Sequence, residues 1–342
     1  MIRVGIIGAS GYTGAELLRL LAGHPQMEVV LATADSNAGG LASTLYPSLA
    51  GPWPNLVFEP FDADQVRGLD LDLVFLGLPH EASMALVPQL IGSVGCVVDL
   101  SAAFRLRDPS LYPQWYGFEH NQTDLLRRAV YGLPERTRKD LPGAPLIATP
   151  GCYVTAATLA LAPLLDAGLV SDAGIIVDAA SGVSGAGRVP TANNAFGTVD
   201  ENFTAYGLLD HRHTPEIEQN LGAQVLFTPH LAPMNRGILA TCYARPAGGR
   251  DLSTDVLLDE FASVYRDEPF VVVTSASPST KAALGSNTAY VSARYDERTG
   301  YVVTLCAIDN LTKGASGGAL QAANVALGLD ETAGLPKAGL YP

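Results

Sequence analysis

The sequence has few charged residues. Of its 342 residues only 16% are charged, while 48% are hydrophobic. A disordered chain has the opposite composition, with few apolar side chains and a high net charge per residue, so disorder is excluded. A folded chain of this length is expected to form about two domains.

Cysteine is also scarce. Cys96, Cys152, Cys242 and Cys306 stand singly, and no two of them form a C-x-x-C pair. This spacing argues against a structural zinc site and against a disulfide framework. We therefore expect no bound metal.

A long hydrophobic run is missing as well. The longest apolar window, from Val154 to Val170, is interrupted by Pro163 and Asp166 and is shorter than the ~20 residues that span a bilayer. At the start, Arg3 leads directly into an apolar run of strand length, which is not the pattern of a secretory signal. The sequence therefore predicts a cytoplasmic protein without a membrane segment.

Basic residues are in the minority. The chain has 21 lysines and arginines against 34 aspartates and glutamates, for a net charge of −13. Such a charge repels phosphate backbones and anionic lipid surfaces. Neither nucleic acid nor a membrane is an expected partner.

The first 150 residues alternate between strand and helix patterns. Residues 3–8 and 28–33 are short apolar runs, and leucines at helical spacing occupy residues 14–22 between them. Two more strand-like runs, at 71–78 and 96–100, flank a helical segment from Glu81 to Ile91. This alternation predicts an α/β fold with an N-terminal, doubly wound parallel sheet of the Rossmann type, here assigned to residues 1–147.

After Ile147 the strands become longer and closer together. Strands are expected over 174–181, 224–231 and 238–244, with a hairpin of 290–295 and 301–308, and helices over 152–167 and 253–267. The pattern predicts an α+β second domain, residues 148–313, with a mostly antiparallel sheet. The last segment, residues 314–342, contains a small apolar helix that we expect to return to the first domain.

A glycine-rich turn joins the first strand to the first helix. Such a turn lets backbone amides approach a pyrophosphate at a helix N-terminus, so it predicts a dinucleotide site. The second strand ends at Asp35, a residue type that binds the ribose 2′-hydroxyl of NAD, but Ser36 and Asn37 could donate to the 2′-phosphate of NADP. These residues leave the choice of cofactor open. The turn consists of Gly8, Ala9, Ser10, Gly11, Tyr12, Thr13 and Gly14.

Cys152 differs from the other cysteines in its surroundings. It follows Gly151 and begins a helical run, so its sulfur is expected at the positive end of a helix dipole. That position lowers a thiol pKa from its usual ~8.5 and yields a nucleophilic thiolate. The other three cysteines lie in apolar strands and are expected to be buried.

Two neighbouring histidines are candidates for acid and base chemistry. His211 and His213 lie two residues apart in a glycine-rich region at the start of a short helix. Glu216 could orient one of the two rings, as carboxylates do in Cys/His systems. A metal site would need further ligands at suitable spacing.

Two segments suggest that the substrate is an anion. Residues 101–107 (SAAFRLR) and 181–188 (SGVSGAGR) each follow a strand and offer hydroxyl groups and arginine. The planar guanidinium group matches phosphate and carboxylate geometry.

Four segments together resemble one known family, that of N-acetyl-gamma-glutamyl-phosphate reductase. They are, in order, residues 8–14 (GASGYTG), 149–153 (TPGCY), 181–188 (SGVSGAGR) and 211–216 (HRHTPE). The resemblance implies an enzyme of arginine biosynthesis that uses NADPH to reduce an acyl phosphate to N-acetylglutamate 5-semialdehyde through a cysteine thioester, with release of phosphate. Ala103 and Val154 depart from the family pattern, which usually has Asp at the first and frequently Pro at the second.

The resemblance also implies roles for individual residues. Cys152 would be the nucleophile and His213 the acid and base, with His211 and Glu216 nearby. We further expect a homodimer or homotetramer. Expected substrate-binding residues are Arg105, Ser101, Arg188 and Ser181. Expected cofactor-binding residues are Gly8, Ser10, Gly11, Tyr12, Thr13, Gly14, Ser36, Asn37, Gly182 and Asn310.

Four alternatives remain. The related aminoadipyl-phosphate reductase of lysine biosynthesis can act on a substrate held by a carrier protein, for which a net charge of −13 is unfavourable. Aspartate-semialdehyde dehydrogenase has the same architecture, but the two-histidine segment fits it poorly. A Cys/His thiol hydrolase would have no need of the dinucleotide turn, and a nicotinamide-sensing regulator would have no need of Cys152.

Overall fold

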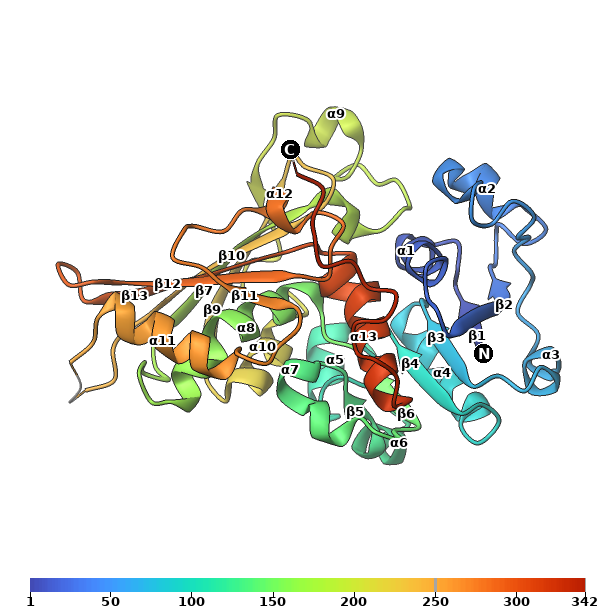
Figure 1. Cartoon of the computed structure of the whole chain (residues 1–342), viewed down its shortest axis with the longest axis horizontal. Helices are drawn as coiled ribbons and strands as arrows, with labels where there is room; N and C mark the ends of the chain where they lie inside the picture. The colour runs from blue at the N-terminus through green and yellow to red at the C-terminus, as the bar shows by residue number, and fades with distance from the viewer. Residues whose placement is uncertain (249–250, 342) are drawn as a thin grey trace. The chain divides into compact units, whose positions relative to one another are not determined.

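The chain divides into two compact units. The computed structural model describes residues 1–248 and 251–341. Unit 1 comprises Met1–Pro150 and Ala315–Leu335, and unit 2 comprises Gly151–Gly314 and the residues from Pro336 on (Figure 1). No helix in the described part of the chain is long and apolar enough to cross a membrane.

Unit 1 is built on a six-stranded parallel sheet with the strand order β2-β1-β3-β4-β6-β5. β3 and β4 are buried along their whole length, as expected for strands in the middle of a parallel sheet. The predicted Rossmann-type architecture is confirmed, although the short strand β5 was not expected. The strands are β1 (Ile2–Ile7), β2 (Met27–Thr33), β3 (Leu73–Leu76), β4 (Cys96–Asp99), β5 (Val130–Tyr131) and β6 (Leu146–Ala148).

The winding of this sheet reverses at β1. The chain runs from β1 to β2 on one side and then to β3 on the other, which makes the carboxyl ends of β1 and β3 the switch point where such folds bind ligands. The helices of unit 1 are α1 (Tyr12–Leu21), α2 (Ala42–Leu45), α3 (Ala63–Gly68), α4 (His80–Leu90), α5 (Leu111–Tyr116), α6 (Thr123–Arg128), α7 (Pro134–Thr137) and α13 (Gly317–Ala326), with 3-10 turns at Pro47–Leu49 and Arg138–Asp140.

Unit 2 contains a seven-stranded sheet with the order β11-β12-β13-β10-β7-β9-β8. Four of its six strand pairings are antiparallel, as predicted, while β11 with β12 and β7 with β9 pair in parallel. The expected hairpin is present, and its turn closes with Gly300 N donating to Asp296 O at 2.8 Å. The strands are β7 (Ile175–Gly182), β8 (Thr204–Ala205), β9 (Val225–Ala232), β10 (Ile238–Ala244), β11 (Val271–Val273), β12 (Ala289–Asp296) and β13 (Tyr301–Ile308).

One face of this second sheet carries the core of unit 2. Helices α8 (Cys152–Asp166), α10 (Thr214–Leu221) and α11 (Thr254–Val264) lie along that face (Figure 1). α8 is buried from residue 153 to 164, because it packs on the sheet and is itself flanked by α10 and α11. On the other face, alternate residues of β7, β10 and β13 are half-buried. The remaining elements are α9 (Phe196–Val199), α12 (Thr280–Ala283), a 3-10 turn at Val183–Ala186 and a π turn at Thr312–Ser316.

The C-terminal segment is shared between the two units. Helix α13 belongs to unit 1, where Gln321 Nε2 donates to Glu135 and Glu331. The residues from Pro336 on belong to unit 2, because Asn287 N donates to Pro336 O at 2.8 Å and Leu340 N donates to the carbonyl of Leu284. The segment expected to return to the first domain as a whole is thus divided at residue 335.

Candidate active site

Cys152 is the first residue of α8, a helix of 15 residues. The capping residue, Gly151, makes no side-chain hydrogen bond to the helix, and the first turn contains no acidic residue. The helix dipole therefore acts on the thiol, which favours the thiolate. Gly314 packs against this cysteine, since a Cβ at Gly314 would lie 2.8 Å from Cys152 Cβ.

The other three cysteines are buried, whereas Cys152 is partly exposed. Burial raises the pKa of the Cys96 and Cys242 thiols to about 12 in each case. These two thiols stay protonated at neutral pH, so Cys152 is the best placed of the four to react.

The ring of His213 lies against the residue that precedes Cys152. A Cβ at Gly151 would lie 2.5 Å from His213 Nε2 and 2.8 Å from two ring carbons, so only glycine leaves room for the imidazole. The carboxylate of Glu216 is fully buried, and Oε1 accepts a hydrogen bond from Gly151 N at 3.0 Å. The structure shows Glu216 bonded to the backbone beside the cysteine, and the suggestion that it also orients a histidine ring stays a prediction.

The ring of His211 is surrounded by aromatic side chains, which form a cage around it. Burial lowers the pKa of His211 to about 4, so its ring is neutral at physiological pH. Its Nδ1 accepts a hydrogen bond from His213 N at 3.1 Å, which fixes the backbone of the neighbouring histidine. His211 therefore acts on the position of His213. The cage consists of Tyr153, Tyr206, His213 and Phe227, with ring centroids 4.9 to 5.6 Å away.

Two tyrosines that the sequence analysis did not single out belong to the same cluster. Tyr206 Oη donates to Tyr153 Oη at 3.1 Å, and Tyr153 Oη donates to the carbonyl oxygen of His230 at 3.1 Å. Burial raises the pKa of Tyr206 to about 12 and that of Tyr153 further, so both phenols stay protonated. The only sequence signal was the position of Tyr153 directly after the cysteine.

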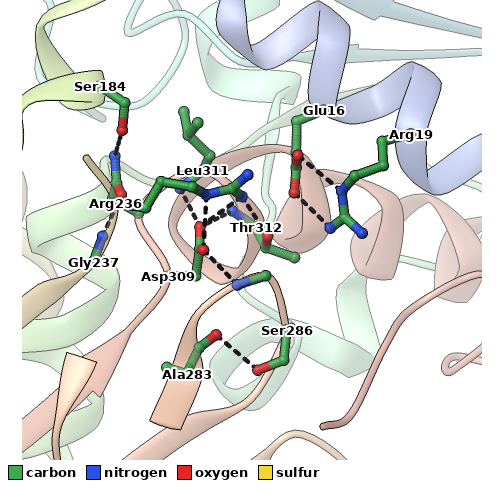
Figure 2. A network of polar contacts seen from close by, with 12 residues as sticks. Glu16, Arg19, Ser184, Arg236, Gly237, Ala283, Ser286, Asp309, Leu311 and Thr312 are labelled. Atoms are coloured by element: carbon green, nitrogen blue, oxygen red, sulfur yellow. Dashed lines mark hydrogen bonds and ion pairs between the residues drawn. The ribbon is translucent and has the colours of Figure 1, made fainter. Parts of the chain in front are cut away.

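A buried carboxylate organises the segments around the end of β13. Asp309 is fully buried and accepts hydrogen bonds from Arg236 Nε and Nη2, both at 2.9 Å (Figure 2). It also accepts from three backbone amides, those of Gly285, Leu311 and Thr312. Five donors on one carboxylate compensate its loss of hydration and hold three loops together.

Asn310 and Gly182, both expected at the cofactor, have clear packing roles within unit 2. Asn310 Oδ1 accepts from Gly237 N at 2.7 Å, and its Nδ2 donates to Ser184 Oγ at 2.9 Å. A Cβ at Gly182 would lie 2.7 Å from the carbonyl oxygen of Asn235. These contacts shape the loop that ends at the partly exposed Arg188, and the cofactor role of both residues stays a prediction.

In unit 1 the glycine-rich turn fits a pyrophosphate. Gly8 has φ +88° and approaches the Gly77 carbonyl so closely that a Cβ would collide with it, which joins the ends of β1 and β3. A Cβ at Gly14 would lie 2.5 Å from the backbone of Ala9. Gly11 caps α1 without a side-chain hydrogen bond, and the first turn, which begins with Tyr12 and Thr13, has no acidic residue. The helix end is therefore suited to receive an anion.

The residues after β2 lie where an adenosine ribose is bound in this fold. Asp35 and Ser36 are exposed and Asn37 is half-buried. Asn37 Nδ2 donates to Ser36 Oγ at 3.3 Å, so the two polar side chains lie next to each other.

Arg105 is the other candidate anion site of unit 1. It is only 8% exposed, and its guanidinium group donates to Thr149 O at 2.6 Å and to Leu100 O at 2.8 Å. These two carbonyl oxygens hold the guanidinium group in place. Ser101, expected to bind substrate, uses its hydroxyl inside the loop, donating to Asp99 Oδ2 at 2.8 Å and accepting from Ala103 N at 3.0 Å.

Comparison with known proteins accounts for both units. The family described as "Semialdehyde dehydrogenase, NAD binding domain" matches residues 3–144, and "Semialdehyde dehydrogenase, dimerisation domain" matches residues 152–310. A protein of Desulforudis audaxviator named N-acetyl-gamma-glutamyl-phosphate reductase is 49% identical over 100% of both chains. The chain belongs to the N-acetyl-gamma-glutamyl-phosphate reductase family.

The family assignment agrees with the resemblance found in the four sequence segments. A reductase of the same name from Symbiobacterium thermophilum is also 49% identical, over 100% of this chain and 99% of the relative. Among solved structures, aspartate semialdehyde dehydrogenase II of Vibrio cholerae superposes with a TM-score of 0.70 over 95% of this chain and 98% of that one, at 17% identity. At this identity the superposition shows only that N-acetyl-gamma-glutamyl-phosphate reductases share the fold of aspartate semialdehyde dehydrogenases.

Proposed function

We propose that this protein reduces N-acetyl-gamma-glutamyl phosphate to N-acetylglutamate 5-semialdehyde, with NADPH as reductant and release of inorganic phosphate, as a step of arginine biosynthesis. Relatives 49% identical over the whole chain carry the name of this activity. The observation that carries the proposal is the placement of Cys152 at the start of α8, with the His213 ring against the residue before it.

The proposed chemistry begins at the sulfur of Cys152. Its thiolate attacks the acyl carbon, the bond from that carbon to the phosphate oxygen breaks, and a thioester and inorganic phosphate result. When bound, NADPH supplies the hydride that reduces the thioester carbonyl.

His213 manages the proton in this scheme. Imidazole both donates and accepts protons near neutral pH, so the ring can protonate the carbonyl-derived oxygen and then withdraw that proton as the carbon–sulfur bond breaks. The aldehyde leaves and the Cys152 thiolate is restored. His211 stays neutral and, together with Glu216, keeps the two reacting groups in place.

The substrate carries negative charge on its phosphate and its carboxylate. We assign Arg105 and Arg188, with Ser181, to these groups, because a guanidinium group binds such anions with two parallel hydrogen bonds. The support for Arg105 is that the carbonyl oxygens of Thr149 and Leu100 accept hydrogen bonds from its guanidinium group and fix the position of that group. Ser101 contributes to this site through the loop that it holds together.

NADPH is the proposed cofactor. The turn from Gly8 to Gly14 would hold the pyrophosphate at the start of α1, and Ser36 and Asn37 would donate to the 2′-phosphate. A solved aspartate semialdehyde dehydrogenase of the same fold, from Candida albicans, contains NADP; it has a TM-score of 0.65 and 15% identity, and covers 95% of this chain and 98% of that one.

We also propose a homodimer formed through the half-buried face of the unit 2 sheet. Leu226, Ile176, Tyr243 and Val303 are cross-strand neighbours in one row of that face, and Leu226 is 49% exposed. Such an apolar row on a domain matched to a dimerisation family is suited to a second copy of the chain. Residence in the cytoplasm is supported by the four free thiols, which a reducing compartment preserves.

The dimer is tested by placing a charge on the proposed face. We expect Val303→Asp to elute as a monomer in light-scattering chromatography. Val256→Asp, at a 40% exposed site on α11 at the opposite face, should leave a mass of two chains. Equal masses for both variants would reject this interface.

The activity is tested most directly in reverse. Purified protein is given N-acetylglutamate 5-semialdehyde, inorganic phosphate and NADP, and reduced nicotinamide is followed by absorbance, with Cys152→Ser as the blank. We expect NADP to be reduced only when inorganic phosphate is present. If NADP were reduced only with the aminoadipate-derived aldehyde, the protein would be the lysine-pathway reductase instead. If no aldehyde led to reduction of NADP, the proposed function would be rejected.

A further inference from the structure

In the loop that carries Arg105, the buried backbone N–H and C=O groups are hydrogen-bonded largely to side chains. Residues 101–106 are all buried, yet none of them belongs to a helix or a strand. Buried N–H and C=O groups need hydrogen-bond partners, and regular structure does not supply them at this loop. The partners therefore have to come from side chains.

Those side chains come from four different places in unit 1. Asp99, at the end of β4, accepts from Ser101 N at 2.9 Å. His80, at the start of α4, accepts from Ala102 N through Nδ1 at 3.0 Å.

The other two supports come from α5 and from the segment after it. Tyr112 Oη donates to Ala102 O and accepts from Leu106 N, both at 3.1 Å. The shortest of these bonds is that of His120, whose Nε2 donates to Ala103 O at 2.7 Å.

Both ring nitrogens of His120 are hydrogen-bonded to the backbone, and Nε2 makes the bond to the loop of Arg105. Nδ1 accepts from Gln122 N at 3.3 Å while Nε2 donates to Ala103, so only the neutral ring with its hydrogen on Nε2 serves both bonds. The imidazole is 7% exposed and lies edge-on to Phe104, with a centroid distance of 5.5 Å. Phe104 and Ala103 are the two residues immediately before Arg105.

We propose that His120 is a positioning residue for substrate binding, which fixes the place of Arg105 through the Ala103 carbonyl and the Phe104 ring. This inference rests on the proposed function, in which Arg105 binds an anionic group of the acyl phosphate. His120 lies 15 residues beyond Arg105 in the sequence, and it acts on the arginine backbone, while Leu100 and Thr149 hold the guanidinium head. Loss of His120 should therefore weaken substrate binding and leave the chemical step largely intact.

The test compares two replacements of the same ring. In His120→Gln the amide nitrogen reaches about as far as Nε2 and keeps the bond to Ala103, whereas His120→Phe keeps the ring volume and loses both hydrogen bonds. We expect His120→Phe to raise KM for the acyl phosphate by about 10- to 100-fold, since displacement by about 1 Å can cost this much. Its kcat and its KM for NADPH should change less than about threefold, and His120→Gln should restore most of the substrate affinity.

A double-mutant cycle with Arg105→Met shows whether His120 acts through the arginine. We expect Arg105→Met to raise KM strongly and His120→Phe to add little on that background. Independent, multiplying effects would overturn the positioning role, as would an unchanged KM in His120→Phe alone. An unchanged KM in Arg105→Met would instead reject the proposed role of Arg105 itself.

A folding defect is controlled separately. If His120→Phe cannot be purified, His120→Asn replaces it, because its amide stops at the level of Nδ1 and does not reach the Ala103 carbonyl. The same rise in KM is expected for a variant whose thermal unfolding is cooperative. A cooperative variant with wild-type KM would overturn the proposal.

Discussion

The imidazole of His213 lies so close to Gly151 that a single methyl group there would come within 2.5 Å of Nε2. This contact couples the proposed acid and base to the residue directly before the proposed nucleophile. We expect Gly151→Ala to push the ring away and to lower kcat by about 10²-fold, because a small displacement of a catalytic group is enough for a loss of this size. Steady-state kinetics measure kcat of this variant. The control is Gly197→Ala, because a Cβ at Gly197 meets open space.

The two neighbouring histidines should respond differently to the same replacement. We expect His213→Asn to lower kcat by roughly 10²- to 10⁴-fold, the usual effect of losing a proton-transfer group. His211→Asn should cost less, because His211 is already neutral and acts by accepting the His213 amide. Small and equal losses would mean that the proton moves through another group.

Cys152→Ser should keep the fold and cofactor binding but lose nearly all turnover. A serine hydroxyl stays protonated where a thiol at a helix N-terminus ionises. Iodoacetamide should label Cys152 well before the buried Cys96, Cys242 and Cys306, as peptide mapping by mass spectrometry would show. Turnover within tenfold of the wild type would contradict the assignment.

Three histidines should make the protein less stable in mild acid. Burial lowers the pKa of His24, His120 and His211 below the value of about 6.5 expected in the unfolded chain. Their neutral rings contribute fully to stability above pH ~6.5, and the contribution is lost as the pH falls toward the lowered pKa, because the unfolded chain then binds protons that the folded chain does not. For His211, with a folded pKa of about 4, the loss at pH 5 is on the order of 2 kcal/mol.

Urea unfolding at pH 7.5 and pH 5 measures this effect. The free energy of unfolding should drop between the two values in the wild type and drop less in His211→Gln, which cannot titrate. An equal drop in both proteins would assign the acid sensitivity to other groups.

Asp35 should influence the choice of cofactor without reversing it. We expect the wild type to have a higher kcat/KM with NADPH than with NADH, and Asp35→Asn to widen the ratio, because removal of a carboxylate lessens repulsion of the 2′-phosphate. The test is to measure kcat/KM with NADPH and with NADH, for the wild type and for Asp35→Asn. A wild-type preference for NADH would show that Asp35 faces the ribose and excludes the phosphate.

Much of the architecture could be derived from local sequence patterns. The turn from Gly8 to Gly14, the start of α8 at Cys152 and the hairpin turn around Gly300 were all predicted, because each depends on residues adjacent in the chain. Strands β8 and β11 were missed, since two- and three-residue strands are too short to show a period. The parallel pairings of β11 with β12 and of β7 with β9 depend on partners distant in the sequence, and no local signal marks them.

The candidate site, too, could be predicted from the sequence only in part. The sequence by itself determined which residues have the chemistry, namely Cys152 before an apolar helix, two histidines near a glutamate, and arginines in loops after strands. Only the tertiary structure decided their environments. It placed Glu216 on the Gly151 amide and enclosed His211 among aromatic rings, and it set His120 beneath the loop of Arg105. Burial and hydrogen bonding, which separate a neutral supporting histidine from a catalytic one, arise from side chains brought together by packing, and the spacing of residues along the chain does not encode them.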